Sequence, residues 1–261
     1  MDTTVQNFAV ANLRRRPLVI ETGGFVLGFD PETRSPFVNY ASPLPRAEPT
    51  AAEVARLVAE FRERGLKPRV EFVPAAAPAV EQALRAAGFA AEEEYAYLVC
   101  TPATLTMPRQ RAHRDSADPE AWLPQARAPH ADEEYAAIDA ALAEAFGSEY
   151  DASAESAARL RRIERLGGVV RYVPAPDGRC AGAGSCSAPA AGTCELAGVG
   201  TRPAFRGRGV AATVTAELTA AMFARGARSV WLESSGDDAR RVYERLGYRA
   251  EGTRLYLTIQ D

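Results

Sequence analysis

The chain contains few of the residues that build metal sites and disulfide frameworks: 2 histidines and 4 cysteines among 261 residues. The cysteines match no zinc-ligand spacing; they are Cys100, Cys180, Cys186 and Cys194. Three of them fall in segments predicted to be strands, where a thiol is usually a small buried hydrophobe. His113 and His130 lie in loop-like sequence without a visible partner. We therefore predict no metal site and no disulfide.

Long apolar runs and a marked excess of one charge sign are also absent. No stretch of 18 apolar residues exists, and the start Met1-Asp2-Thr3-Thr4 lacks the basic segment of a secretory signal. A formal net charge of -3 gives no basic footprint for nucleic acid. We expect a cytoplasmic protein with neither a nucleic-acid nor a membrane partner, and a homodimer remains open.

The sequence predicts alternating helices and strands in two halves. The first half predicts a helix over 5–15, strands over 18–22, 25–29 and 37–40, a helix over 51–64, a strand over 69–73, a helix over 79–87 and a strand over 91–99. The second predicts an edge strand over 121–127, helices over 133–146 and 154–166, strands over 169–174, 179–187 and 193–201, a helix over 209–225, a strand over 229–233, a helix over 237–246 and a closing strand or strand pair over 248–259. We predict an α/β fold (α+β, with mixed sheets) of two domains, residues 1–100 and 121–261, joined by a polar, proline-flanked linker over 101–120.

The two halves repeat one pattern: helix, strand, helix, Gly-aromatic, strand. The helix before each strand ends in Arg-Gly, at Arg64-Gly65 and again at Arg225-Gly226. The Gly-aromatic pairs are Gly88-Phe89 and Gly247-Tyr248. The alternative is coincidence between two alanine-rich α/β segments; we favour duplication.

The stretch Arg206-Gly207-Arg208-Gly209-Val210-Ala211 follows a predicted strand and opens a predicted helix. A helix N-terminus presents unpaired backbone N–H groups, and its dipole favours negative charge. The glycines allow a ligand to approach the backbone closely, so the stretch predicts a phosphate or pyrophosphate cradle. Neither the dinucleotide pattern G-x-G-x-x-G nor a Walker G-K-[ST] is present. The alternative is a basic glycine turn at the start of an ordinary helix. In the first half, residues 42–50 hold three prolines and no glycine, so no cradle is expected there.

A second motif follows one strand later, as Ala239-x-x-x-Tyr243-x-x-x-Gly247-Tyr248. Tyr243 shares a helix face with Val242 and Leu246, so a core tyrosine is the alternative to a functional one. Together the two motifs resemble [RQ]-x-x-G-x-[GA] and A-x-x-x-Y-x-x-x-G-[FY] of the GNAT acyltransferases. The resemblance covers residues 121–259, with the first half a degenerate copy or an appended domain. Gly236 departs from the family, where many members carry asparagine.

The resemblance implies tandem GNAT-like halves, each a twisted, mainly antiparallel sheet flanked by helices. It implies direct transfer of an acetyl or other acyl group from acetyl-CoA to a primary amine. The pyrophosphate would lie on the backbone of Arg206, Gly207, Arg208, Gly209, Val210 and Ala211. The pantetheine would run beside the strand at Val199 and Thr201.

In the same resemblance, Tyr243 would protonate the leaving thiolate. Glu195 would be the general base, because strand alternation predicts that it shares a face with Val199 and Thr201. An ordinary exposed carboxylate is the alternative for Glu195, and Glu233 is a lesser candidate. The acceptor stays open between a small-molecule amine, a peptide N-terminus and a lysine side chain. A non-catalytic acyl-CoA-binding sensor or interaction protein is the rival function. A nucleotide module is disfavoured because no Walker lysine is present.

Overall fold

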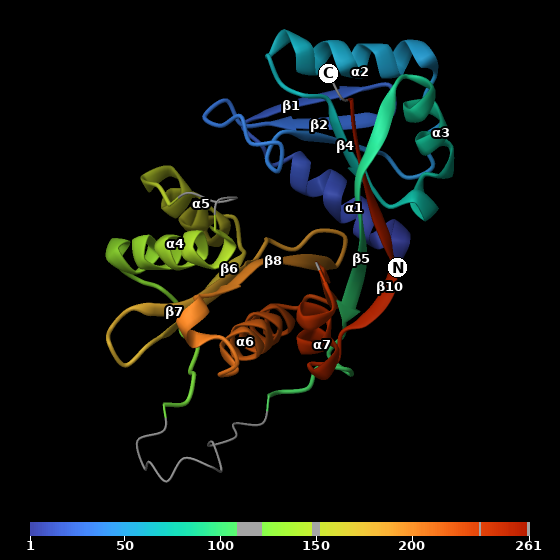
Figure 1. Cartoon of the computed structure of the whole chain (residues 1–261). Coiled ribbons are helices and arrows are strands. Elements are labelled where there is room, and N and C mark those ends of the chain that lie inside the picture. Colours follow the sequence, from blue (N-terminus) through green and yellow to red (C-terminus); the bar gives the residue numbers. More distant parts are fainter. Residues whose placement is uncertain (109–121, 148–151, 235, 260–261) are drawn as a thin grey trace. The chain divides into compact units, whose positions relative to one another are not determined.

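The computed structural model describes residues 1–108, 122–147, 152–234 and 236–259. The chain divides into two units. The first holds Met1–Tyr97 together with the chain from Ala250 onward, and the second holds Leu98–Arg249. Among the described helices, none is long and apolar enough to cross a membrane. Figure 1 shows the elements of both units.

The first unit contains α1 (Asp2–Leu13), β1 (Leu18–Thr22), β2 (Phe25–Phe29), β3 (Tyr40–Pro43), α2 (Ala51–Glu63), β4 (Arg69–Phe72), a 3-10 turn (Pro74–Ala76), α3 (Pro78–Ala86), β5 (Phe89–Cys100) and β10 (Arg249–Ile259). Its strands are ordered β1-β2-β3-β4-β10-β5. The pairs β1–β2, β2–β3 and β4–β10 are antiparallel, and β3–β4 is parallel.

Alternation along β2 sends side chains to two helical layers. Phe25, Leu27 and Phe29 enter a core with α2 and α3, whereas Val26 packs with α1. Figure 1 accordingly shows α1 and α2 on opposite faces of these strands. The period-2 pattern thus gives this short sheet a hydrophobic layer on each side.

The strand β3 starts three residues later than the sequence predicts, because Asn39 organises the preceding turn. The Asn39 side chain accepts the Asp30 N–H at 2.8 Å and donates to the Thr33 and Ser35 carbonyls at 2.8 and 3.1 Å. These bonds tie residues 30–39 into a compact turn, so regular pairing begins only at Tyr40.

The second unit contains α4 (Asp132–Phe146), α5 (Ala154–Arg165), β6 (Val169–Pro174), β7 (Cys180–Cys186), β8 (Thr193–Thr201), a 3-10 turn (Pro203–Phe205), α6 (Val210–Ala224), β9 (Ser229–Glu233) and α7 (Asp237–Arg245). Its strands are ordered β9-β8-β7-β6. The pairs β6–β7 and β7–β8 are antiparallel, and β8–β9 is parallel. The predicted repeat is present: three strands, a helix, a strand parallel to the third, a helix and a last strand occur in both halves.

Two helical layers also cover the sheet of the second unit. Ile138, Leu142 and Leu160 of α4 and α5 pack with Val170 and Ala183 of the sheet. The helix α6 covers the opposite face, as Figure 1 shows.

Two expectations about the second half need correction. Ala121 lies outside the described residues, and residues 122–127 form no strand but only one bridge, from Arg127 to Tyr172. Pro124 cannot donate to a ladder, which explains the missing strand. The closing segment is one strand, and it joins the first unit by pairing with β4, where Leu255 and Leu257 enter the core. The predicted domain boundary therefore fails at β10.

The predicted linker 101–120 is described only as far as residue 108. Its first residues belong to the second unit, where the Thr106 N–H donates to the Leu246 carbonyl at 3.0 Å. Residues 109–120 lie outside the described chain.

Candidate active site

The strand β8 carries a bulge in its second half. Ser185 lies opposite Ala197, but Ala183 lies opposite Gly200. One residue of β7, Gly184, therefore faces two residues of β8, Gly198 and Val199. Gly198 has a φ of 63°, a left-handed conformation that glycine adopts without strain. A bulge of this kind re-aims the side chains that follow it.

The bulge changes the face on which Glu195 lies. Opposed residues of an antiparallel pair share a face, so Gly200 lies on the face of Ala183, which packs against α4. Ser185, two residues after Ala183, lies on the same face, and so does Ala197 opposite it. Glu195 is two residues before Ala197 and lies on that face as well. The expectation that Glu195 shares a face with Val199 and Thr201 is wrong, because the extra residue reverses the alternation.

Val199 and Thr201 do share a face, and it is the face of α6. A Cβ built on Gly184 would lie 3.0 Å from Val199 Cγ2 and 3.2 Å from Val214 Cγ1 of α6. Thr201 lies opposite Gly182, whose Cβ position is 2.8 Å from Val210 Cγ1. The Thr201 Oγ1 is buried and has no hydrogen-bond partner among the described residues. Such a hydroxyl can bond a ligand that reaches it.

The pairing between β8 and β9 stops early. It runs from Thr193–Ser229 to Glu195–Trp231, although both strands continue, and within the described strands it goes no further. Beyond Glu195 the β9-facing edge of β8 therefore keeps backbone N–H and C=O groups that the sheet does not use. An extended ligand with amide groups can add to such an edge as a strand does.

The glycine turn leads from the end of β8 into α6. Gly207 and Gly209 have φ values of 75° and 81°, so both are left-handed. Among the described residues, a Cβ on Gly207 would meet nothing within 4 Å, and one on Gly209 would meet only Pro124 Cγ, at 3.8 Å. The left-handed conformation rather than crowding thus requires glycine, and no described residue fills the space over the turn.

The start of α6 is uncapped, unlike the matching helix of the first unit. Gly209 is its N-cap and offers no side chain, so the first N–H groups of α6 have no side-chain cap. At α2, by contrast, the Glu53 carboxylate accepts the Thr50 N–H at 2.8 Å in a capping box. Hydrogen bonds from Thr50 lower the pKa of Glu53, so this helix start already holds an anion. Of these two matching helices, α6 is the one whose start has no such carboxylate and can accept an external anion.

Arg206 and Arg208 act differently in the turn. The Arg206 guanidinium donates to the carbonyls of Thr201 at 3.4 Å and Ala145 at 3.1 Å, so it joins β8 to the end of α4. The exposed Arg208 lies 5.9 Å from the centroid of the Phe205 ring. The Arg208 side chain can therefore contact an anion bound at the turn, whereas the Arg206 side chain holds the turn against β8 and α4.

Tyr243 is half-buried on α7 and packs against Tyr248, with ring centroids 6.1 Å apart. The Tyr248 hydroxyl bonds Thr219 Oγ1 of α6 at 2.6 Å, which places both rings on the α6 side of the sheet. Burial raises the pKa of Tyr243 to about 12. Among the described residues the Tyr243 hydroxyl makes no hydrogen bond. The phenol stays protonated at neutral pH and has its proton free to donate.

The end of α7 fixes where Tyr243 lies. The Tyr248 N–H donates to the Tyr243 carbonyl at 3.2 Å, and Gly247 takes a φ of 94° to close the helix. A Cβ on Gly247 would overlap the Thr104 carbonyl, so no other residue fits there.

Glu195 is half-buried on the α4 face of β8, and Glu233 is half-buried at the end of β9. Tyr243 and Glu195 therefore belong to opposite faces, separated by the strand whose edge is open. Sequence alternation missed this arrangement, although Gly198 and Gly200 inside a predicted strand were a signal of a bulge. Among the described residues, no cluster of three or more histidine, cysteine or acidic side chains could hold a metal.

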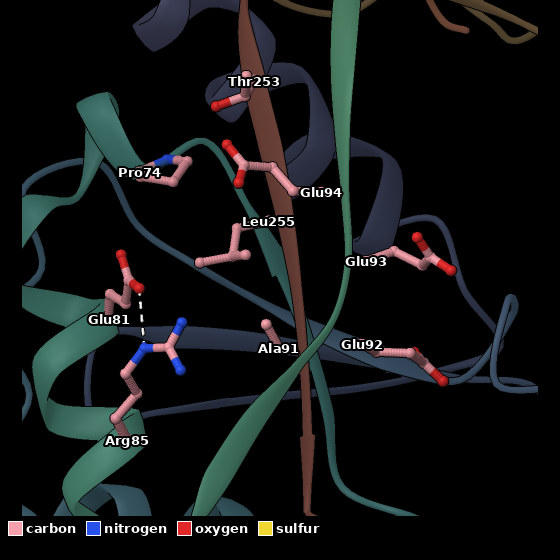
Figure 2. Close-up of a pocket in the computed structure, with 9 residues that line it drawn as sticks. All are labelled: Pro74, Glu81, Arg85, Ala91, Glu92, Glu93, Glu94, Thr253 and Leu255. Atoms are coloured by element: carbon pink, nitrogen blue, oxygen red, sulfur yellow. Dashed lines mark hydrogen bonds and ion pairs between the residues drawn. The ribbon is translucent and has the colours of Figure 1, made fainter. Parts of the chain in front are cut away.

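A cavity of about 430 Å³ lies in the first unit (Figure 2). Four glutamates line it, at positions 81, 92, 93 and 94, and Arg85 is paired with Glu81 at 2.8 Å. An acidic lining repels phosphate. The cavity is thus unsuited to the ligand that the start of α6 would accept.

The chain resembles known proteins in part of its sequence and in its fold. Residues 135–248 match the model of the acetyltransferase (GNAT) family. No curated protein sequence matches the chain. A GCN5-related N-acetyltransferase from Kribbella flavida is 24% identical with a TM-score of 0.81, covering 100% of this chain and 96% of its own. A putative GNAT acetyltransferase from Novosphingobium aromaticivorans is 23% identical with a TM-score of 0.58, covering 98% of both chains.

A tandem GNAT protein from the clavulanic acid biosynthesis pathway has a TM-score of 0.60 at 14% identity, covering 91% of this chain and 78% of its own. At these identities the solved structures support only the fold. The family model matches the sequence of residues 135–248. The second half of this chain, residues 135–248, is a GNAT acetyltransferase domain.

Proposed function

We propose that the second unit transfers an acetyl group from acetyl-CoA directly to a primary amine. The observation that carries the proposal is the uncapped start of α6 beside the open edge of β8. A pyrophosphate suits the first feature, and the amide groups of a pantetheine arm suit the second. The first unit lacks the glycine turn and has its own carboxylate at the matching helix, so it contributes no second site of this kind.

In this proposal the bulge supplies the donor for the thioester oxygen. Gly198 and Val199 share one opposing residue, so the bulge leaves backbone N–H groups outside the regular ladder. A fixed N–H aimed at a carbonyl oxygen stabilises the negative charge that develops as the carbonyl is attacked. Val199 is the residue that we assign to this role.

Proton transfers in the proposal use the two faces of β8. The amine nitrogen bonds to the acyl carbon and loses a proton to Glu195, and the carbon–sulfur bond breaks. Tyr243 gives its proton to the departing sulfur, so the products are an amide and free CoA. Because Glu195 and Tyr243 lie on opposite faces of β8, the acceptor amine and the leaving thiol can approach the acyl carbon from different sides of the strand.

The proposal is tested by incubating the protein with acetyl-CoA and a library of amines while thiol release is followed. We expect release that depends on the amine, together with a rise in melting temperature with acetyl-CoA alone. A ligand at 100 times its dissociation constant adds about 2.7 kcal/mol to the free energy of unfolding. Stabilisation without turnover of any amine would favour the rival function, a non-catalytic acyl-CoA sensor. If acetyl-CoA causes neither thiol release nor stabilisation, both the proposed acetyl transfer and the sensor function are contradicted.

The substitution Glu195→Gln tests the general base. An alkylamine is mostly protonated at neutral pH, since its pKa is about 10, so a base is needed there and becomes dispensable as pH rises. We expect kcat/KM to fall by about 10²-fold at pH 7, within the range of general base catalysis, and to recover toward the parent near pH 10.

Glu233→Gln is the matched control, because Glu233 is also a half-buried carboxylate at the neighbouring strand. We expect it to leave the pH profile unchanged. A loss from Glu195→Gln that is equal at every pH would assign Glu195 a binding or structural role instead.

A further inference from the structure

The α4 face of β8 presents a short row of residues beside the bulge. Glu195, Ala197 and Gly200 share this face. Glu195 is half-buried, and Ala197 is exposed although it lies within the strand. A small exposed residue next to the carboxylate leaves surface on which the body of an acceptor can lie.

The far end of this row meets the last turn of α4. A Cβ on Gly200 would lie 2.8 Å from Leu142 Cδ2, 3.0 Å from Ala145 Cβ and 3.3 Å from Phe146 Cε2. Glycine at 200 thus lets α4 approach the strand directly and brings the Phe146 ring beside the bulge. Phe146 is nevertheless 41% exposed. An apolar ring therefore lies beside Gly200, the neighbour in the chain of Val199, to which we assign the thioester oxygen.

Among the described residues of α4, two carboxylates on the same helix as the ring already have partners. Glu144, two residues before Phe146, forms an ion pair with Arg202. Asp139, further back on α4, accepts the Ser153 N–H at 2.7 Å. Within the described part of α4, a second ammonium group on the acceptor would therefore meet a phenyl ring and two carboxylates that already have partners.

We propose that Phe146 and Ala197 bind the body of the acceptor, and that the acceptor is a monoamine with an aromatic or alkyl body. This inference rests on the proposed acetyl transfer, because Glu195 must receive the proton of the same amine. Burial of a phenyl-sized group is worth about tenfold or more in affinity. A cation over an exposed aromatic ring gains less than about tenfold, so a diamine is the poorer acceptor.

The test compares 2-phenylethylamine with 1,4-diaminobutane as acceptors for the full chain. We expect the parent to favour 2-phenylethylamine by about tenfold or more in kcat/KM. Phe146→Ala should lower kcat/KM for 2-phenylethylamine about tenfold, mainly through KM, and change the value for diaminobutane less than about twofold. Phe146→Leu keeps an apolar side chain and should retain most of the activity.

Leu166→Ala is the control, because Leu166 is also a large exposed apolar residue, 49% exposed, at the end of α5. It should leave both amines unaffected. Turnover of diaminobutane equal to or above that of 2-phenylethylamine would overturn the inference and leave the proposed acetyl transfer intact. An equal loss for both amines in Phe146→Ala would also overturn it. Turnover of neither amine, nor of any other, would remove the inference together with the proposed function.

Discussion

Replacement of Gly209 by aspartate is expected to abolish acetyl-CoA binding while the second unit stays folded. The residue is the N-cap of α6, and its φ of 81° is one that aspartate enters more readily than most residues. A carboxylate about 4 Å from a phosphate charge costs about 4 kcal/mol at an effective dielectric constant of 20. That energy corresponds to about 10³-fold in affinity. The helix dipole favours the new charge, and no described residue crowds the turn, so little stability should be lost.

Calorimetric titration with acetyl-CoA measures this loss directly, and the melting temperature without ligand reports the fold. Gly209→Asn has nearly the same shape without the charge and should lose less affinity. Gly226→Asp is the second control, because Gly226 closes α6 at its other end with a φ of 88° and has nothing within 4 Å of its Cβ position. Unchanged affinity in a folded Gly209→Asp variant would contradict the assignment of the turn as the phosphate site.

Tyr243→Phe is expected to lower kcat by about 10²–10⁴-fold, the usual contribution of a general acid. Only the hydroxyl is removed, and it has no hydrogen-bond partner among the described residues, so packing against Tyr248 should survive. Affinity for acetyl-CoA and the melting temperature should therefore change little. Because burial raises the pKa of Tyr243 to about 12, the phenol keeps its proton throughout the pH range of an ordinary assay. No alkaline fall in kcat below about pH 11 should come from this group.

Tyr248→Phe is the matched control for this substitution. It also removes one hydroxyl, but this hydroxyl is fully buried and bonded to Thr219 at 2.6 Å. We expect it to reduce the free energy of unfolding by about 1 kcal/mol and to spare the proton donor. If Tyr243→Phe turns over like the parent, Tyr243 is a packing residue. If it loses acetyl-CoA binding instead, its hydroxyl holds the thioester and does not act as the acid.

Local signals predicted most of the elements. The hairpin around Gly23-Gly24 has the predicted bounds, because two left-handed glycines close a tight turn whatever surrounds them. The turn at Gly207 and Gly209 and the helix after it were also predicted, since strand, glycine turn and helix N-terminus are consecutive in the chain. The same holds for Tyr243, whose place on α7 follows from helical spacing. In each case the local structure depends only on residues close by in the sequence.

Only the tertiary structure decided the rest of the site. Strict alternation put Glu195 on the face of Val199, but the register against β7 inserts an extra residue at Gly198 and reverses it. The edge beyond Glu195 is open because β9 stops pairing there. Phe146 approaches the bulge because Gly200, some fifty residues later, has no side chain.

The last strand shows the same limit on a larger scale. Its apolar residues predict a strand, but they do not name the sheet that it joins. Leu255 and Leu257 complete the core of the first unit beside Phe72 and Val70 of β4, far away in the sequence. Strand partners and register are chosen by burial and hydrogen bonding between distant segments, and the free energy of those contacts exists only once the chain has folded.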